Sequence, residues 1–203
     1  MRPRSAGFTL LEVLFALALL GLLLTMLGSA LVAGNRAMAR GERYAQGLDE
    51  LRSAQNFIRQ AVQQALPLGL RRVSREPAVV FDGQAQYLRF SAVLPQALGG
   101  GIQVHTFDLV ELADGQALRV AFADPLLRPW GQPQVLLRGV RQLRLAYQGL
   151  DPEGQATDWL APWPWPARLP QKVRVQLQVA GPAGWVSQTV ALRLDLGATQ
   201  AAP

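Results

Sequence analysis

Apolar side chains follow three successive patterns along the chain, and the first is an almost unbroken run. Between Phe8 and Gly34 the only charged side chain is Glu12. At about 1.5 Å per residue, a helix of this length reaches roughly 40 Å, more than the ~30 Å hydrocarbon core of a bilayer. The pattern therefore predicts a membrane-spanning helix over residues 8–34.

The second pattern has helical spacing and covers residues 35–66. No proline interrupts this stretch, and apolar residues recur three, four or seven positions apart, with polar residues opposite them. The apolar positions are Tyr44, Leu48, Leu51, Ile58, Val62 and Ala65. We expect an amphipathic continuation of the helix that packs on the chain's own globular domain, with a partner helix as the alternative. Pro67 and Gly69 are expected to end the helix.

From Val79 onward the period changes to two, which is typical of half-buried strands. Clear alternation predicts strands around residues 118–122, 143–147, 173–179 and 190–196, with shorter candidates at 79–81, 87–93 and 104–112. Turn signals such as Asp114-Gly115 separate them, and no helical pattern intervenes. The sequence therefore predicts an α+β fold, in which a long N-terminal helix packs on a largely antiparallel sheet formed by residues 67–203.

A short basic leader, Met1 to Gly7, precedes the apolar run. A secretory signal peptide is one interpretation, with Gly28-Ser29-Ala30 as its cleavage site, but the run is too long and carries an acid near its start. The segment Gly7-Phe8-Thr9-Leu10-Leu11-Glu12 resembles the type IV prepilin processing motif. The resemblance implies that a prepilin peptidase cuts after Gly7, that Phe8 becomes the methylated N-terminus, and that Glu12 stays in the membrane helix.

A carboxylate in the span needs a physical reason. A charge at mid-helix costs about 2.5 to 3.5 kcal/mol on the insertion scale. The eleven leucines of the span, at roughly −0.3 to −0.6 kcal/mol each, offset that cost. In the family that the motif resembles, this acid meets the N-terminal amine of a neighbouring subunit, and such a staggered contact builds a filament. A Glu12 that reaches the headgroups or is protonated is the alternative.

Charge and composition exclude several classes of function. The chain has no Cys, which excludes disulfides and thiolate chemistry. Its net charge of +6 is spread out, with thirteen basic and ten acidic side chains after residue 59, so we expect no nucleic-acid partner. Orientation in the membrane is not decided by charge, because arginines flank both ends of the span.

Residue types that carry chemistry are sparse. His105 is the only histidine and falls in a predicted strand or loop. No catalytic set, metal cluster or nucleotide loop is present, so we expect no enzyme, no cofactor and no small-molecule substrate. The glycines at 99–101 predict a flexible turn or bulge. The scattered carboxylates Asp108, Glu111, Asp114 and Asp124 are expected to be solvated charges, and Asp151, Glu153 and Asp158 come closest to a calcium loop, weakly.

A Trp- and Pro-rich segment spans residues 159–166. Trp159, Trp163 and Trp165 offer large apolar area, and the prolines favour an extended path. One interpretation is a loop whose indoles fold over the edge of the sheet. The other is a patch that binds a partner, because Trp is enriched at interface hot spots.

Three segments of the C-terminal half resemble the minor pseudopilin J family of type II secretion systems. They are Leu136 to Leu145, Asp158-Trp159 with the following Trp-Pro segment, and Leu169 to Val175. The resemblance implies a pilin-like fold and a bacterial inner-membrane protein, single-pass, with its N-terminus cytoplasmic and its main domain periplasmic. It also implies a tip complex with minor pseudopilins I and K, beneath which the major pseudopilin forms a pseudopilus that drives export of folded proteins.

Two other interpretations stay open at the sequence level. A minor type IV pilin would share the leader and the helix but serve pilus assembly, adhesion or DNA uptake. A membrane-tethered enzyme or a secreted soluble β-protein would belong to a different class, and the mature N-terminus would distinguish them: Phe8 for a pilin, a residue near Leu31 for a signal peptide.

Overall fold

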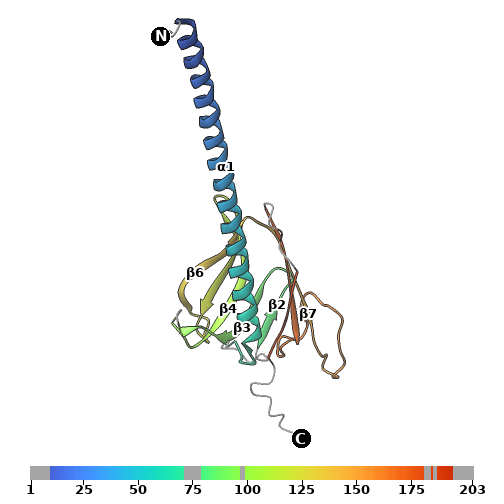
Figure 1. The fold of residues 1–203 in the computed structure, drawn as a ribbon. Helices are drawn as coiled ribbons and strands as arrows, with labels where there is room; N and C mark the ends of the chain where they lie inside the picture. Colours follow the sequence, from blue (N-terminus) through green and yellow to red (C-terminus); the bar gives the residue numbers. More distant parts are fainter. Residues whose placement is uncertain (1–9, 71–78, 97–98, 181–183, 185–186, 194–203) are drawn as a thin grey trace, which may run out of the picture. The chain divides into compact units, whose positions relative to one another are not determined.

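The computed structural model describes residues 10–70, 79–96, 99–180, 184 and 187–193 of the 203-residue chain. The chain divides into two compact units, Met1–Gln46 and Gly47–Pro203. The helix α1, Leu10–Gln63, begins in the first unit and ends in the second (Figure 1). The predicted α+β class, with a long N-terminal helix and an antiparallel β domain, is confirmed.

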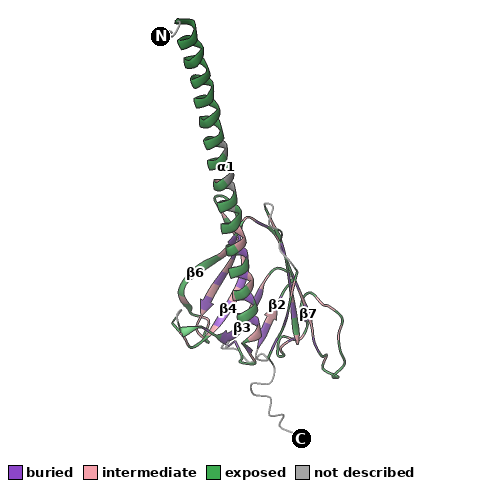
Figure 2. Ribbon diagram, viewed as in Figure 1, coloured by how far each residue is buried: buried purple, intermediate pink, exposed green. Residues whose placement is uncertain are grey.

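The first unit contributes an exposed, apolar part of α1. Among the described residues, the stretch Leu10–Arg36 is long and apolar enough to cross a membrane. Its large apolar side chains are exposed, with Leu17 and Leu24 each at 59%, and Figure 2 shows the described residues of this part of the helix as exposed. Exposed leucines at this density require an apolar surrounding, which a bilayer supplies. The predicted boundaries at Gly7 and Phe8 lie outside the described residues.

The end of the helix differs from the prediction. We expected helix up to Leu66, but α1 ends at Gln63, and β1, Ala65–Leu66, pairs antiparallel with β3, Leu88–Val93. Pro67 disfavours helical geometry at the residue before it and pushes that residue towards extended backbone. Leu66 therefore leaves the helix early, and its backbone finds a strand partner at Ser91.

The strands form two antiparallel sheets. The larger sheet has the order β1-β3-β4-β5-β6, with β2 also paired to β3, and the smaller has the order β7-β8-β9. The larger sheet contains β2 (Phe81–Gly83), β3 (Leu88–Val93), β4 (Ile102–Leu112), β5 (Gly115–Ala123) and β6 (Pro129–Arg138). The smaller contains β7 (Val140–Gln148), β8 (Lys172–Val179) and β9 (Gln188–Ala191).

Most predicted strands are present, with shifts at their ends. The candidate at 79–81 appears as β2, two residues later, and the last strand ends at Ala191, while Leu194 and Leu196 lie outside the described residues. The sequence did not predict β6, since its Pro129, Gly131 and Pro133 hide the alternation. Pro129 pairs with Ala123, and the register shift between Val120 and Phe122 of β5 accommodates Gly131 and Pro133, as β-bulges do at sheet edges.

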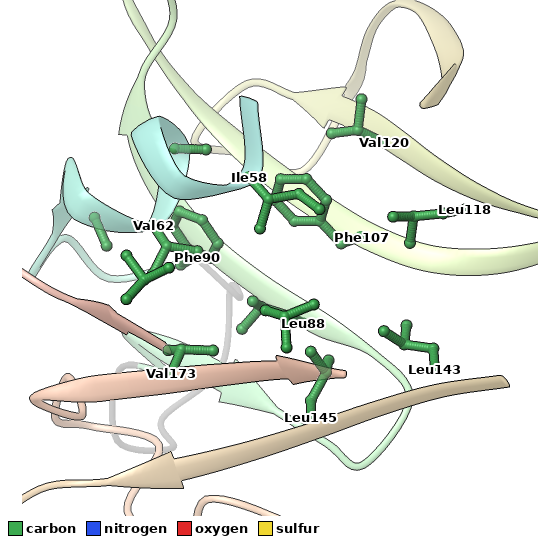
Figure 3. Packing of buried hydrophobic residues seen from close by; sticks show 14 of the residues in the cluster. Ile58, Val62, Leu88, Phe90, Phe107, Leu118, Val120, Leu143, Leu145 and Val173 are labelled. Atoms are coloured by element: carbon green, nitrogen blue, oxygen red, sulfur yellow. The ribbon is translucent and has the colours of Figure 1, made fainter. Parts of the chain in front are cut away.

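The core lies where the second half of α1 and both sheets meet. Ile58 and Val62 of α1 point towards Phe90 and Phe107 of the larger sheet, and Leu145 and Val173 come from the smaller one (Figure 3). Val62, Phe90 and Val173 are fully buried. The expectation that the amphipathic stripe docks on the chain's own domain is therefore met for the part of the helix after Gly47.

Candidate functional site

Of the three residues predicted for processing and assembly at the N-terminus, the structure describes only Glu12. Gly7 and Phe8 lie outside the described residues, whereas Glu12 lies in the first turn of α1. A carboxylate there complements the partial positive charge of the helix N-terminus. Glu12 is an exposed residue on an otherwise apolar segment. The structure does not test the predicted assembly role of Glu12, which stays a prediction.

The Trp-Pro segment lies in the connection between β7 and β8, and the indoles of Trp163 and Trp165 pack against the core. Trp163 is 4% exposed, and its Nε1 donates to the carbonyl of Arg168 at 2.9 Å. Trp165 is half-buried and meets Trp163 edge to face at 4.9 Å between ring centroids. Gly149 passes directly beneath, because a Cβ there would lie 2.8 Å from the Trp163 ring. The indoles of Trp163 and Trp165 therefore cover the core on the side of this loop.

The prediction of a partner patch made of three tryptophans needs a correction for one of them. Trp163 is part of the core and offers no free face. Trp159 is half-buried, and its ring stacks against Arg174 of β8, with the guanidinium carbon 3.8 Å from the ring centroid. For Trp159 and Trp165 the role in partner binding stays a prediction. The sequence alone does not predict the pairing with Arg174, because the two residues are fifteen positions apart.

His105 is a core residue of β4. It is 1% exposed, stacks on Phe90 and meets the edge of Phe122, and its Nδ1 lies 3.0 Å from the carbonyl oxygen of Gln103. Burial lowers its pKa to about 4, against which the hydrogen bond to Gln103 acts. The ring is therefore neutral at neutral pH and fills space between aromatic side chains.

The carboxylates are more engaged than expected. Asp108 makes a two-pronged pair with Arg119, at 2.9 and 2.6 Å, and this contact raises the pKa of Arg119. Asp124 accepts hydrogen bonds from the backbone N–H groups of Arg128 and Leu126. These bonds close the β5–β6 loop and lower the pKa of Asp124. Asp114 pairs with Arg138. The expectation of solvated charges was thus wrong for Asp108 and Asp124, whose side chains are 23% exposed, whereas the side chain of Asp114 is 62% exposed and stays solvated.

The described residues contain no group of three or more His, Asp or Glu side chains placed to hold a metal ion. In the weak calcium candidate, Asp151 instead accepts from the backbone N–H of Gln155 at 2.7 Å. This bond closes a turn of the kind that Asp commonly makes. Gly99, Gly100 and Gly101 all have positive φ, as the predicted tight turn requires.

Comparison with known proteins identifies the family. A family model described as type II secretion system, protein J, matches residues 29–192, and a model of the prokaryotic N-terminal methylation motif matches residues 2–28. Type II secretion system protein J of Xanthomonas campestris pv. campestris is 35% identical over 204 residues, covering 95% of each chain. The chain belongs to the type II secretion system protein J family. This decides between the two pilin-like interpretations in favour of type II secretion.

A solved structure shares the fold. A chain in the crystal structure of the GspK-GspI-GspJ complex from the enterotoxigenic Escherichia coli type 2 secretion system matches with a TM-score of 0.52 and 20% identity. The match covers 72% of this chain and 97% of that one. The predicted pilin-like architecture is thereby confirmed. Membership of the family and the apolar first part of α1 together fit anchoring in the inner membrane.

Proposed function

We propose that this chain is a minor pseudopilin of the tip complex that starts the periplasmic pseudopilus of a type II secretion system. The observation that carries the proposal is the protein J match over residues 29–192, joined to a methylation motif over residues 2–28. The solved complex of GspK, GspI and GspJ concerns related proteins, and it supports I- and K-type minor pseudopilins as the partners here. The major pseudopilin would join beneath them.

In this proposal the N-terminus carries the assembly chemistry. A prepilin peptidase cuts between Gly7 and Phe8, and Phe8 is then N-methylated. Glu12 follows four positions later, which is about 6 Å of rise along a helix. A carboxylate and an amine that are each costly in lipid become less costly when paired. Glu12 therefore pairs with the N-terminal amine of an adjacent subunit and sets the stagger between helices.

The same proposal fixes the orientation. The basic leader stays in the cytoplasm, α1 crosses the inner membrane, and the β domain lies in the periplasm. The role is structural: the domain offers surfaces to other subunits, with Trp159 and Trp165 as candidate contacts, and catalyses no reaction. No nucleic acid and no small-molecule substrate takes part.

The test joins two measurements on the full chain in its own membrane. Intact-mass analysis is expected to give a mature protein that begins at a methylated Phe8. Co-purification in mild detergent is expected to recover the I- and K-type subunits of the same system. A mature chain that retains residues before Phe8, or wild-type protein that recovers neither subunit, would contradict the proposal.

A further inference from the structure

The outward face of the smaller sheet, β7-β8-β9, carries an uncompensated positive charge. Ten side chains alternate away from the core on these strands, and three are cationic, four are amides and none is acidic. They are Gln142, Arg144, Ala146, Gln148, Lys172, Arg174, Gln176, Gln178, Thr189 and Ala191. We call these ten residues the basic face. The sequence counts suggested evenly spread charge, but the strand register gathers it here.

In and beside the larger sheet, three arginines are each paired with an aspartate. Arg119, Arg128 and Arg138 each meet an Asp carboxylate at 2.6 to 3.2 Å. By contrast, no described carboxylate lies within 4.0 Å of the charged ends of Arg144, Lys172 or Arg174. The described aspartates that pair with arginines therefore lie on α1 or in and beside the larger sheet, and none of them pairs with a cation of the basic face.

The cations lie in a diagonal row that the register defines. Arg144 is opposite Gln176 and Arg174 is opposite Ala146, so the two arginines are diagonal neighbours, while Lys172 follows two positions along β8. Diagonal neighbours on a sheet are about 7–8 Å apart. Like charges this close repel one another, and a partner that brings carboxylates removes this cost.

One of the three cations is held in place. The guanidinium of Arg174 lies 3.8 Å from the centroid of the Trp159 ring, in the loop that covers one end of the basic face. Stacking engages the flat face of a guanidinium and leaves its in-plane N–H donors for another acceptor. Such a side chain loses little further freedom when it binds a carboxylate. This arrangement favours a directional protein contact over a diffuse attraction.

We propose that the basic face binds a carboxylate-bearing surface of another subunit in the tip complex. The inference rests on the proposed function for the identity of the assembly, and it assigns the contact to β7-β8-β9. The amides around the cations suit a mixed polar protein surface, since they can donate and accept. A second copy of this chain is disfavoured, because the chain carries more basic than acidic side chains even without Arg2 and Arg4 of the leader, and like net charges repel.

Two other anionic partners fit less well. The strongly salt-dependent binding of nucleic acid comes from about six to ten phosphate contacts, and basic clusters that recruit membranes hold about four to eight cations. The basic face offers three. Its remaining side chains include no large apolar residue that would insert into a lipid surface.

The experiment uses the full chain, co-expressed with the I- and K-type subunits of its own system. The variant Arg144→Glu/Lys172→Glu reverses the two exposed cations of the basic face and leaves Arg174 on Trp159. The control Arg59→Glu/Arg193→Glu makes the same charge change at two exposed arginines outside it. We expect the basic-face variant to recover at least tenfold less of one partner subunit, and the control to recover as much as the wild type.

A rescue arm separates charge pairing from misfolding. Arg144→Lys/Lys172→Arg is expected to bind like the wild type, and reversing acids on the partner is expected to restore binding to the Glu variant. Recovery of both subunits at wild-type level by the Glu variant would overturn the inference while the tip-complex role stands. Wild-type protein that recovers neither subunit would overturn both.

A photo-crosslinker identifies the occupant directly. Gln176→p-benzoylphenylalanine places the probe between Arg144 and Arg174 on the exposed surface of β8. An adduct with a pseudopilin in intact cells supports the inference. An adduct with phospholipid or nucleic acid, and none with protein, overturns it.

Discussion

Glu12 and His105 are two titratable side chains in apolar surroundings, and each is tolerated for a different reason. Glu12 lies at the start of an exposed apolar helix segment, where a partner molecule can reach it. His105 lies inside the β domain, where the neutral ring packs between Phe90 and Phe122. The first is therefore expected to matter for assembly, and the second for stability.

We expect Glu12→Leu to insert into the membrane and fold normally but to enter the pseudopilus poorly. Removing the carboxylate makes the span more apolar, which favours insertion, and leaves the neighbour's amine without its partner. The measurement compares sheared pseudopilus fractions with membrane fractions, with Glu12→Asp as the charge-retaining control. Incorporation of the Leu variant at the wild-type level would contradict the pairing.

His105 makes the stability of the domain depend on pH. Its folded-state pKa is lowered to about 4 from 6.5, so the unfolded chain binds the proton more readily. The contribution is complete above pH 6.5 and is lost as the pH falls from 6.5 towards 4. At 1.36 kcal/mol per unit, we expect a loss of about 2 kcal/mol between pH 7 and pH 5. Urea unfolding at both pH values tests this, and His105→Leu is expected to flatten the difference.

At the scale of elements, the two parts of α1 have different surroundings. Its first part exposes leucines on all sides, whereas after Gly47 only one stripe is buried. Leu51, Ile58 and Val62 lie at heptad and half-heptad spacing on that stripe, and each is at most 6% exposed. Spacing of this kind buries one side of a helix against a sheet.

Truncation of this stripe is expected to destabilise the domain strongly. Ile58→Ala removes a side chain that is 3% exposed, and such changes cost about 2–5 kcal/mol. Arg59→Ala, one position along, changes an exposed residue bonded only to Asn56 in the described part of the chain, and we expect an effect within about 0.5 kcal/mol. Equal shifts in the urea midpoint for the two variants would contradict the packing described for α1.

At the scale of the whole molecule, the anchor and the β domain have separate sources of stability. Among the described residues, the core runs from Leu51 to Leu192 within the unit Gly47–Pro203 and includes no residue of the apolar first part of α1. The exposed apolar side chains of that first part require a bilayer, whereas the domain buries its apolar side chains in its own core.

A chain that starts at residue 35 is therefore expected to be soluble and folded. It retains the unit Gly47–Pro203, so its urea midpoint should match that of the full chain in detergent. Sedimentation of cell extracts should place the shortened chain in the soluble fraction and the full chain with the membranes. An unfolded or aggregated shortened chain would show that the anchor contributes to the core.

Local patterns in the sequence determined the helix, most of the strands, the processing motif and the position of Glu12. These features depend on neighbours a few residues away: helical or two-residue periodicity, the proline after Leu66, and the spacing of Gly7, Phe8 and Glu12. β6 was missed because its periodicity is broken by proline and glycine and is restored only by pairing with β5.

Tertiary structure alone decided which distant side chains meet. The burial of Trp163 beneath Gly149, the stacking of Trp159 on Arg174, and the pairing of Asp108 with Arg119 join residues 11 to 15 positions apart. The basic face likewise exists only because β7 and β8 pair in one register, which a shift by one residue would destroy. The composition gives the number of charged side chains, and the strand register decides which of them lie on the same face.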